Sequence, residues 1–105
     1  MTAQLIEWRH ALHRIPETGF DEHRTGDAVA GFLTGLGLEP VRGIGGTGIV
    51  ASVRRGTSAR AIGLRADMDG LPIGEASGLD YSSEHEGRMH ACGHDAHMAM
   101  VLGAG

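Results

Sequence analysis

The residue types best suited to chemistry lie together in residues 89–97, which read Met-His-Ala-Cys-Gly-His-Asp-Ala-His. This stretch holds the only cysteine of the chain, three of its seven histidines and an aspartate. Imidazole and thiolate are the usual ligands of zinc and neighbouring divalent ions, and carboxylate is a harder partner. A single cysteine cannot form an internal disulfide, so Cys92 acts in thiolate chemistry or in packing. The stretch predicts a metal site; the alternative is a buried helix start with an inert thiol.

The spacing within this stretch favours the metal site. Cys92 and His94 are two residues apart, and a helix would point them in different directions. Gly93 permits a turn that brings both side chains to one point. From Asp95 onward, small and apolar residues predict a helix, whose N-terminal dipole would favour a thiolate or carboxylate beside it.

A second candidate site follows the apolar run 61–66, which predicts a strand. Asp67 and Asp69 come directly after it. Carboxylates at the end of a strand in an α/β domain commonly lie at the mouth of a site. The simpler alternative is an Asx turn that leads into Gly70 and Pro72.

Two helices are predicted before these motifs. Thr2 can cap the first, and Pro16 ends it. Asp21 can cap the second, which is predicted over 22–36. The first helix has one apolar face, formed by Leu5, Trp8, Leu12 and Ile15.

Short strands are predicted over 38–41, 49–53 and 61–66. The glycine-rich residues 43–48 lack the Lys-Ser/Thr ending of a phosphate loop and precede no long helix, so a hairpin or bulge is favoured over nucleotide binding. The polar residues 54–58 suggest an antiparallel hairpin between the last two strands.

Composition limits the class of protein. The 105 residues, 41% of them hydrophobic, suffice for one domain at most. Nine basic against thirteen acidic residues argue against a nucleic-acid surface. The absence of a long apolar run or signal peptide predicts no membrane span, and with the lone cysteine it predicts a cytoplasmic protein. The apolar pattern still runs at Gly105, which suggests a truncated domain. His10, His13 and His85 are interpreted as solvated surface residues.

Two motifs together resemble a known family. The motifs are residues 64–73 (Leu-Arg-Ala-Asp-Met-Asp-Gly-Leu-Pro-Ile) and residues 89–97. Both closely resemble the M20 metallopeptidase family. The resemblance is closest to its amidohydrolases of N-acyl amino acids, such as hippurate hydrolases, aminoacylase-like enzymes and auxin-conjugate hydrolases. Residues 9–13, 16–20 and Glu22 match the start of that branch. The resemblance implies an α/β fold: part of a three-layer, zinc-peptidase-like catalytic domain, its mixed sheet mostly parallel, with flanking helices and without the lid domain.

The resemblance also implies a catalytic centre with two divalent metal ions. In such a centre Cys92 is a thiolate ligand shared by both ions, and His94 is a ligand of one of them. Asp69 matches the family's supporting carboxylate, which orients a metal ligand without binding the metal itself. Two ions a few ångströms apart polarise a substrate carbonyl and lower the pKa of a bridging water.

Three further residues receive supporting roles by resemblance. Asp67 stands where other branches of the family place a metal-binding histidine. Asp95 and His97 are expected to cap the helix and hydrogen-bond around the ligands. The family's glutamate base and its other ligands have no counterpart in residues 1–105, so this chain alone is expected to be inactive.

The resulting hypothesis is an amidohydrolase that removes the acyl group from small N-acyl amino acids, with zinc, manganese, cobalt or nickel as metals. Deacetylation of a biosynthetic intermediate, ester hydrolysis and carbamoyl hydrolysis are alternatives with the same ligands. The longer protein is a candidate homo-oligomer. The rival hypothesis is a non-catalytic fragment or a metal-binding or interaction module, whose uncovered apolar face seeks a partner.

Overall fold

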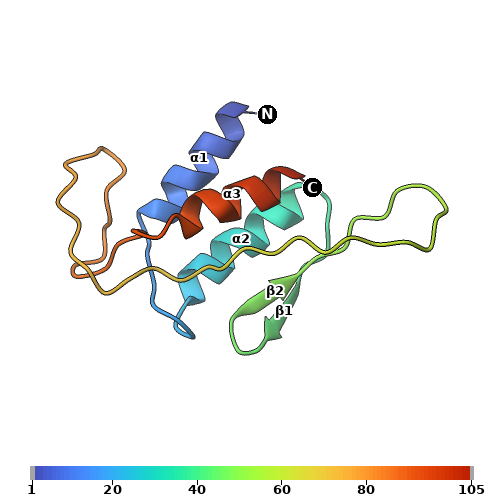
Figure 1. The fold of residues 1–105 in the computed structure, drawn as a ribbon, viewed down its shortest axis with the longest axis horizontal. Helices are drawn as coiled ribbons and strands as arrows, with labels where there is room; N and C mark the ends of the chain where they lie inside the picture. Colours follow the sequence, from blue (N-terminus) through green and yellow to red (C-terminus); the bar gives the residue numbers. More distant parts are fainter. Residues whose placement is uncertain (1, 105) are drawn as a thin grey trace.

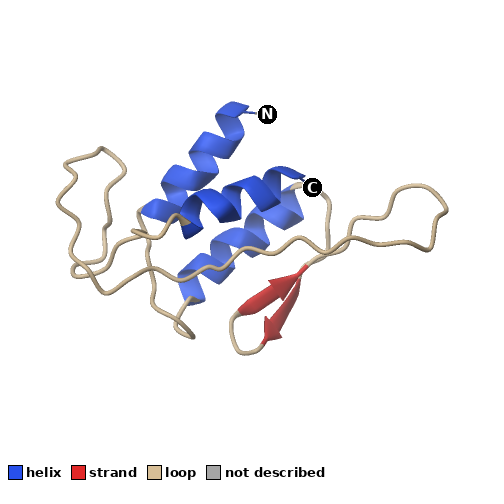
Figure 2. Ribbon diagram, in the orientation of Figure 1, coloured by secondary structure: helices blue, strands red, loops and turns tan. Residues whose placement is uncertain are grey.

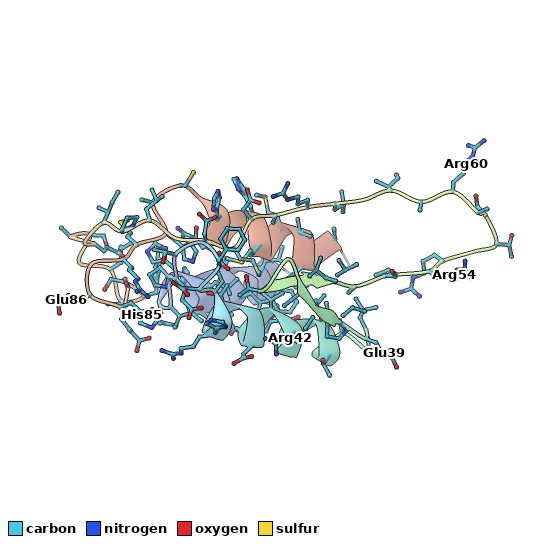
Figure 3. All side chains as sticks on the ribbon, turned by 90° about the horizontal axis from the view of Figure 1, so that it is seen from below. Glu39, Arg42, Arg54, Arg60, His85 and Glu86 are labelled. Carbon is cyan, nitrogen blue, oxygen red and sulfur yellow. The ribbon has the colours of Figure 1, made fainter. Side chains whose placement is uncertain are left out.

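The computed structural model describes residues 2–104 as an α/β arrangement of three helices and one small sheet (Figures 1 and 2). The elements follow the order α1 (Thr2–His13), α2 (His23–Gly35), β1 (Val41–Ile44), β2 (Gly48–Val50) and α3 (His94–Ala104). The molecule is elongated, 49 × 31 × 20 Å, because a long loop extends from each side. Figure 3 shows Arg54 and Arg60 on one loop and His85 and Glu86 on the other. Within residues 2–104, no helix has the length and apolar character needed to cross a membrane.

The hydrophobic core lies where the three helices meet (Figure 1). Trp8 and Leu12 of α1 are buried, as the apolar spacing of this helix predicts, and the Trp8 ring stacks on Phe32 of α2 with centroids 5.3 Å apart. Met98 and Leu102 of α3 complete the core. Helix α3 is therefore fixed by burial of its apolar residues, and its N-terminus is positioned at one end of this core.

The start of α2 is capped differently from the prediction. Asp21 is exposed, and the N-cap residue Glu22 makes no side-chain cap hydrogen bond. Instead, the Glu17 carboxylate accepts hydrogen bonds from the backbone N–H groups of Arg24 and Thr25, at 3.1 and 2.6 Å. The prediction of Asp21 as the cap was wrong because the turn after Pro16 folds the longer Glu17 side chain back over these free N–H groups.

The glycine-rich residues 43–48 form a hairpin, as predicted. Strands β1 and β2 pair antiparallel, with Val41 opposite Val50, and the register shifts between Arg42 and Ile44. The residue between them, Gly43, has φ +80°, a conformation that glycine adopts without steric cost. The strand predicted over 38–41 begins three residues later, at Val41, and it pairs with β2, which follows the glycines.

The predicted hairpin between 49–53 and 61–66 is absent. Among the described residues, the segment 51–69 makes no backbone-to-backbone hydrogen bond. It first projects away from the helices as the loop that carries Arg54 and Arg60 and then runs back past them as an extended chain (Figures 2 and 3). Its apolar side chains Ile62 and Leu64 are 90% and 63% exposed. A run of strand-forming residues does not pair unless a second strand lies beside it. The larger mixed sheet in three layers remains a prediction, since the sheet described here has two antiparallel strands.

Candidate metal centre

The Cys92–His94 motif forms a turn immediately before α3. Gly93 has φ +88°, so it adopts the left-handed turn that the sequence predicts at this position. Helix α3 begins at His94, and the thiol of Cys92 is exposed just outside its first turn. On the upstream side, a β-bridge between Leu71 and Met89 joins the two chain segments that carry the candidate motifs.

His94 is held by Asp69, which lies 25 positions earlier in the chain. The imidazole Nδ1 is 2.9 Å from the backbone carbonyl of Asp69 and 2.9 Å from its carboxylate Oδ1. The carbonyl oxygen accepts a hydrogen bond from Nδ1 and the carboxylate lies within ion-pair distance, so in the neutral ring Nδ1 carries the proton and Nε2 keeps its lone pair. The structure thus brings the two motifs together, with an arrangement typical of a metal-binding histidine oriented by a carboxylate.

Asp95 is buried and faces α1. Its Oδ2 accepts hydrogen bonds from Nδ1 of His13, at 2.8 Å, and from Nε of Arg9, at 3.0 Å. Burial by itself raises the pKa of Asp95, but the hydrogen bonds from His13 and the Ala96 backbone and the charges of Arg9 and His90 outweigh it and lower that pKa. Asp95 therefore anchors the first turn of α3 to the first helix.

The other two residues with expected supporting roles lie at the surface. Asp67 pairs with Nη2 of Arg65 at 2.7 Å, and half of its side chain is exposed. His97 is exposed on α3, with its ring centroid 6.0 Å from that of His94 and its backbone N–H donating to the Gly93 carbonyl at 3.0 Å. Neither makes a hydrogen bond to His94 in the structure described for residues 2–104.

His13 is buried, so its interpretation as a surface residue was wrong. It is 2% exposed, with Nδ1 facing Asp95 and Nε2 3.0 Å from Oε1 of Glu75. No pattern in the sequence indicates this contact, because Glu75 lies in a polar loop 62 positions away. His10 and His85 are partly exposed; His10 stacks on Tyr81, with ring centroids 3.6 Å apart.

His90 is the other buried histidine that sequence reasoning left without a role. It is 4% exposed, and neither ring nitrogen has a hydrogen-bond partner within the described part of the chain. Burial, assisted by the charges of His13 and His94, lowers the pKa of His90 from its usual 6.5 despite the opposing carboxylates of Asp95 and Asp69. The imidazole is therefore neutral at pH 7.

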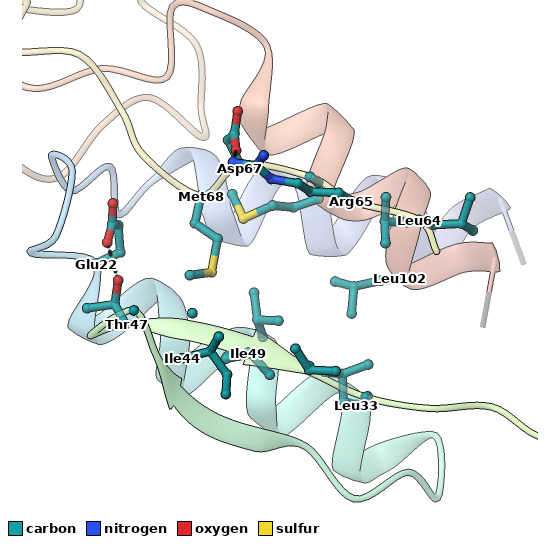
Figure 4. Close-up of a pocket in the computed structure, with 18 of the residues that line it drawn as sticks. Glu22, Leu33, Ile44, Thr47, Ile49, Leu64, Arg65, Asp67, Met68 and Leu102 are labelled. Carbon is teal, nitrogen blue, oxygen red and sulfur yellow. Dashed lines mark hydrogen bonds and ion pairs between the residues drawn. The ribbon is translucent and has the colours of Figure 1, made fainter. Parts of the chain in front are cut away.

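An open hollow of about 880 Å³ lies beside the candidate centre, between the hairpin, the helices and the extended segment (Figure 4). Asp67 and Asp69 are among the residues that line it, but Cys92 and His94 are not. Figure 4 shows Leu33, Ile49 and Leu102 in its lining. This mainly apolar lining is typical of a surface that further packing covers.

The candidate centre has no complete ligand set within the described residues. Nowhere in residues 2–104 do three or more His, Cys, Asp or Glu side chains converge closely enough to hold an ion. An exposed thiol and an imidazole with a free Nε2 are nevertheless suitable donors for a divalent transition metal.

Known proteins resemble both the sequence and the fold. Residues 63–105 match the model of Peptidase family M20/M25/M40. Hippurate hydrolase of Campylobacter jejuni is 49% identical over 94 residues, which are 90% of this chain and 24% of that protein. N-acetyldiaminopimelate deacetylase of Oceanobacillus iheyensis is 49% identical over an alignment of 105 residues, and the match covers 99% of this chain and 28% of that protein. The chain thus spans about a quarter of the length of these two relatives.

A Rhodococcus jostii protein provisionally named glutamate–cysteine ligase 2-3 is also 50% identical over 101 residues, 96% of this chain, but these form only 13% of that protein. Among solved structures, a Bacillus subtilis protein described as a dinuclear metal-binding peptidase of the M20 family superposes with a TM-score of 0.90 and 36% identity. That match covers 96% of this chain and 28% of the other. The family match over residues 63–105, the hydrolase relatives and the shared fold together support the assignment of this chain to the M20 peptidase family, so that it resembles hydrolytic enzymes.

Proposed function

We propose that this chain is the N-terminal part of the catalytic domain of a metal-dependent amidohydrolase that removes the acyl group from N-acyl amino acids. The names of two relatives, a hippurate hydrolase and an N-acetyldiaminopimelate deacetylase, support this substrate class, because both denote hydrolysis of an amide on an N-acylated amino acid. The observation that carries the proposal is the hydrogen bonding of His94 by Asp69 beside the exposed thiol of Cys92.

The residues of the candidate centre have distinct tasks in this proposal. Cys92 and His94 would hold divalent ions through the thiolate and Nε2, and Asp69 keeps the imidazole in the tautomer that can bind. Bound divalent ions supply Lewis-acid chemistry, which polarises a carbonyl and makes hydroxide available near neutral pH. Asp95 fixes the first turn of α3, while Asp67 and His97 contribute polar groups at the rim.

Two ligands are too few for a two-metal centre, so further ligands and the general base would lie outside these residues. A protein described as binding two metals, with a TM-score of 0.90 to this chain, supports a dinuclear centre. Zinc, manganese, cobalt and nickel all suit mixed sulfur, nitrogen and oxygen donors. A cytoplasmic location and assembly into a homo-oligomer are also part of the proposal.

The test uses the longest natural reading frame that contains this chain. The purified protein is stripped of metal and assayed for release of amino acid from N-acetyl and N-benzoyl amino acids, with each of the four metals added back. We expect hydrolysis only with metal. Cys92→Ala should lower kcat/KM by more than about 100-fold, because losing an outer-shell partner alone costs about 10–100-fold. His23→Ala, at an exposed histidine of α2, is the matched control.

Hydrolysis that persists without metal, or that Cys92→Ala leaves unchanged, would overturn the proposal. The second candidate, a non-catalytic interaction module, is favoured by the exposed apolar side chains of the extended segment, such as Ile62 and Leu64. Metal binding without hydrolysis of any N-acyl amino acid in the panel would favour it.

A further inference from the structure

His13 joins two carboxylates from distant parts of the chain. Its Nδ1 lies 2.8 Å from Oδ2 of Asp95, and its Nε2 lies 3.0 and 3.2 Å from the two carboxylate oxygens of Glu75. The side chains of all three residues are at most 3% exposed. Buried, charge-assisted hydrogen bonds of this kind hold their partners in one geometry.

Each of the two carboxylates also accepts hydrogen bonds from other groups. Asp95 also accepts a hydrogen bond from Nε of Arg9 at 3.0 Å, and Glu75 accepts from the Ser77 hydroxyl and, at 2.9 Å, from the backbone N–H of Ser83. His13 is thus the link between two separately anchored groups. We refer to Glu75, His13 and Asp95 as the histidine clamp.

The clamp connects the two chain segments that build the candidate metal centre. Asp95 directly follows His94 in the first turn of α3, so holding Asp95 holds the backbone of the candidate ligand. Glu75 follows Asp69 by six positions, just beyond the β-bridge between Leu71 and Met89. A single imidazole on α1 therefore ties the segment that supplies His94 to the segment that supplies Asp69.

We propose that His13 is a positioning residue of the metal centre, which acts through Asp95 and Glu75 on the Asp69–His94 pair. This inference rests on the proposed function, because it assigns a task relative to the metal held by Cys92 and His94. Loss of the clamp lets the two segments shift relative to one another and weakens the orientation of His94. Outer-shell partners of this kind change metal affinity or activity by about 10–100-fold.

The test compares clamp variants of the longest natural reading frame that contains this chain. His13→Gln retains a donor toward one carboxylate but cannot donate to both. His10→Gln makes the same chemical change three residues earlier in α1, where the ring stacks on Tyr81. Glu75→Ala removes the other end of the clamp from a loop outside the helical core, so it stays informative if His13→Gln fails to fold.

Two measurements separate positioning from folding. The Kd for Co²⁺ is obtained from the thiolate-to-cobalt charge-transfer absorption, and the thermal midpoint is measured on metal-free protein. We expect His13→Gln and Glu75→Ala to weaken Co²⁺ binding by about 10–100-fold with a changed absorption spectrum, while His10→Gln matches wild type. The metal-free midpoint of Glu75→Ala should lie below that of His10→Gln, because the stabilisation by the Glu75 carboxylate is lost, and Co²⁺ binding should weaken by more than this difference accounts for.

The outcomes distinguish the clamp from the proposed function. If wild type binds Co²⁺ tightly and both clamp variants bind it equally well with the same spectrum, His13 does not position the centre. The same conclusion follows if Co²⁺ binding weakens only in proportion to a lower metal-free midpoint. If wild type shows no thiolate-to-cobalt band, the proposed function fails, and with it the role of His13.

Discussion

At the scale of single residues, the proposed metal binding depends on the pair formed by His94 and Asp69. The imidazole is mostly buried, and its Nδ1 faces two oxygens of one residue. A histidine held in this way presents Nε2 in a fixed direction, which reduces the entropy lost when a ligand binds. The carboxylate contributes charge as well as orientation, because it makes the ring a stronger donor to a cation.

Asp69→Asn should therefore weaken metal binding by about tenfold or more, since the amide keeps the shape but loses the charge. Zn²⁺ competition with a chromophoric chelator measures the affinity. Asp27→Asn is the matched control, because Asp27 pairs with Arg42 at the surface and such exposed pairs contribute little. Equal affinities for Asp69→Asn and wild type would show that Asp69 does not support the ligand.

Glu75 and Asp95 make the stability of the fold sensitive to acid. Burial by itself raises the pKa of Glu75, but hydrogen bonds from Ser77, Ser83 and His13 outweigh it, so the folded-state pKa lies below the ordinary 4.5. Between these two values the unfolded chain binds more protons than the folded chain. The stabilisation is therefore complete above pH 4.5 and is lost as the pH falls through the folded-state pKa.

Glu75→Gln should flatten this acid dependence. Its free energy of unfolding should fall less steeply than that of wild type as the pH is lowered below 4.5, and Asp95 should supply the slope that remains. Urea unfolding at a series of pH values measures the difference. Parallel pH profiles for the two proteins would contradict the assigned role of the Glu75 carboxylate.

At the scale of elements, Gly70 determines how closely the segment of Asp69 approaches the turn after α1. A Cβ at this position would lie 2.8 Å from Cβ of Pro16 and 3.2 Å from the carbonyl oxygen of Met89. The backbone N–H of Gly70 also donates to the Glu17 carbonyl at 2.7 Å. Two backbone segments and a rigid proline ring leave no room for a side chain.

Gly70→Ala should destabilise the fold by about 1–3 kcal/mol, the usual cost of overpacking, and should displace Asp69 from His94. Gly74→Ala is the matched control, because its Cβ would meet no atom within 4 Å. Urea unfolding and Zn²⁺ affinity are measured for both variants. A Gly70→Ala protein with wild-type stability and affinity would show that this close approach does not position the centre.

At the scale of the whole molecule, the extended segment 51–69 is the feature that most needs a partner. It exposes apolar side chains such as Ile62, and its backbone makes no main-chain hydrogen bonds in the part of the chain that the structure describes. The apolar hollow beside it is open to solvent. Unpaired extended backbone with apolar side chains promotes association with another strand.

The 105-residue chain on its own should therefore self-associate as its concentration rises, and Ile62→Lys should reduce this association. Thr57→Lys adds the same charge at an exposed polar position of the same segment and should have a smaller effect. Sedimentation velocity over a range of concentrations measures the change. A monomeric wild-type chain at every concentration would contradict this interpretation of the segment.

Local patterns predicted the elements that local interactions stabilise. The apolar spacing of α1, the glycine turn of the hairpin and the turn at Gly93 all follow from residues close in sequence. The pairing of 61–66 was predicted wrongly, because a strand forms only where a neighbouring strand lies beside it.

The contacts of His13 could not be predicted either. They join α1 to a loop and to α3 across 62 and 82 positions, and no periodic pattern records such a contact. The contact between Asp69 and His94 could be predicted only because the two motifs that contain these residues resemble the same family.

The most direct test of the central claim is the metal stoichiometry of the longest natural reading frame that contains this chain, measured beside its Cys92→Ala variant. We predict that the wild-type protein binds two divalent ions with a thiolate-to-cobalt band in the Co²⁺ form, and that Cys92→Ala loses this band and at least one ion. An unchanged stoichiometry and activity in Cys92→Ala would contradict the assignment of Cys92 and His94 as ligands.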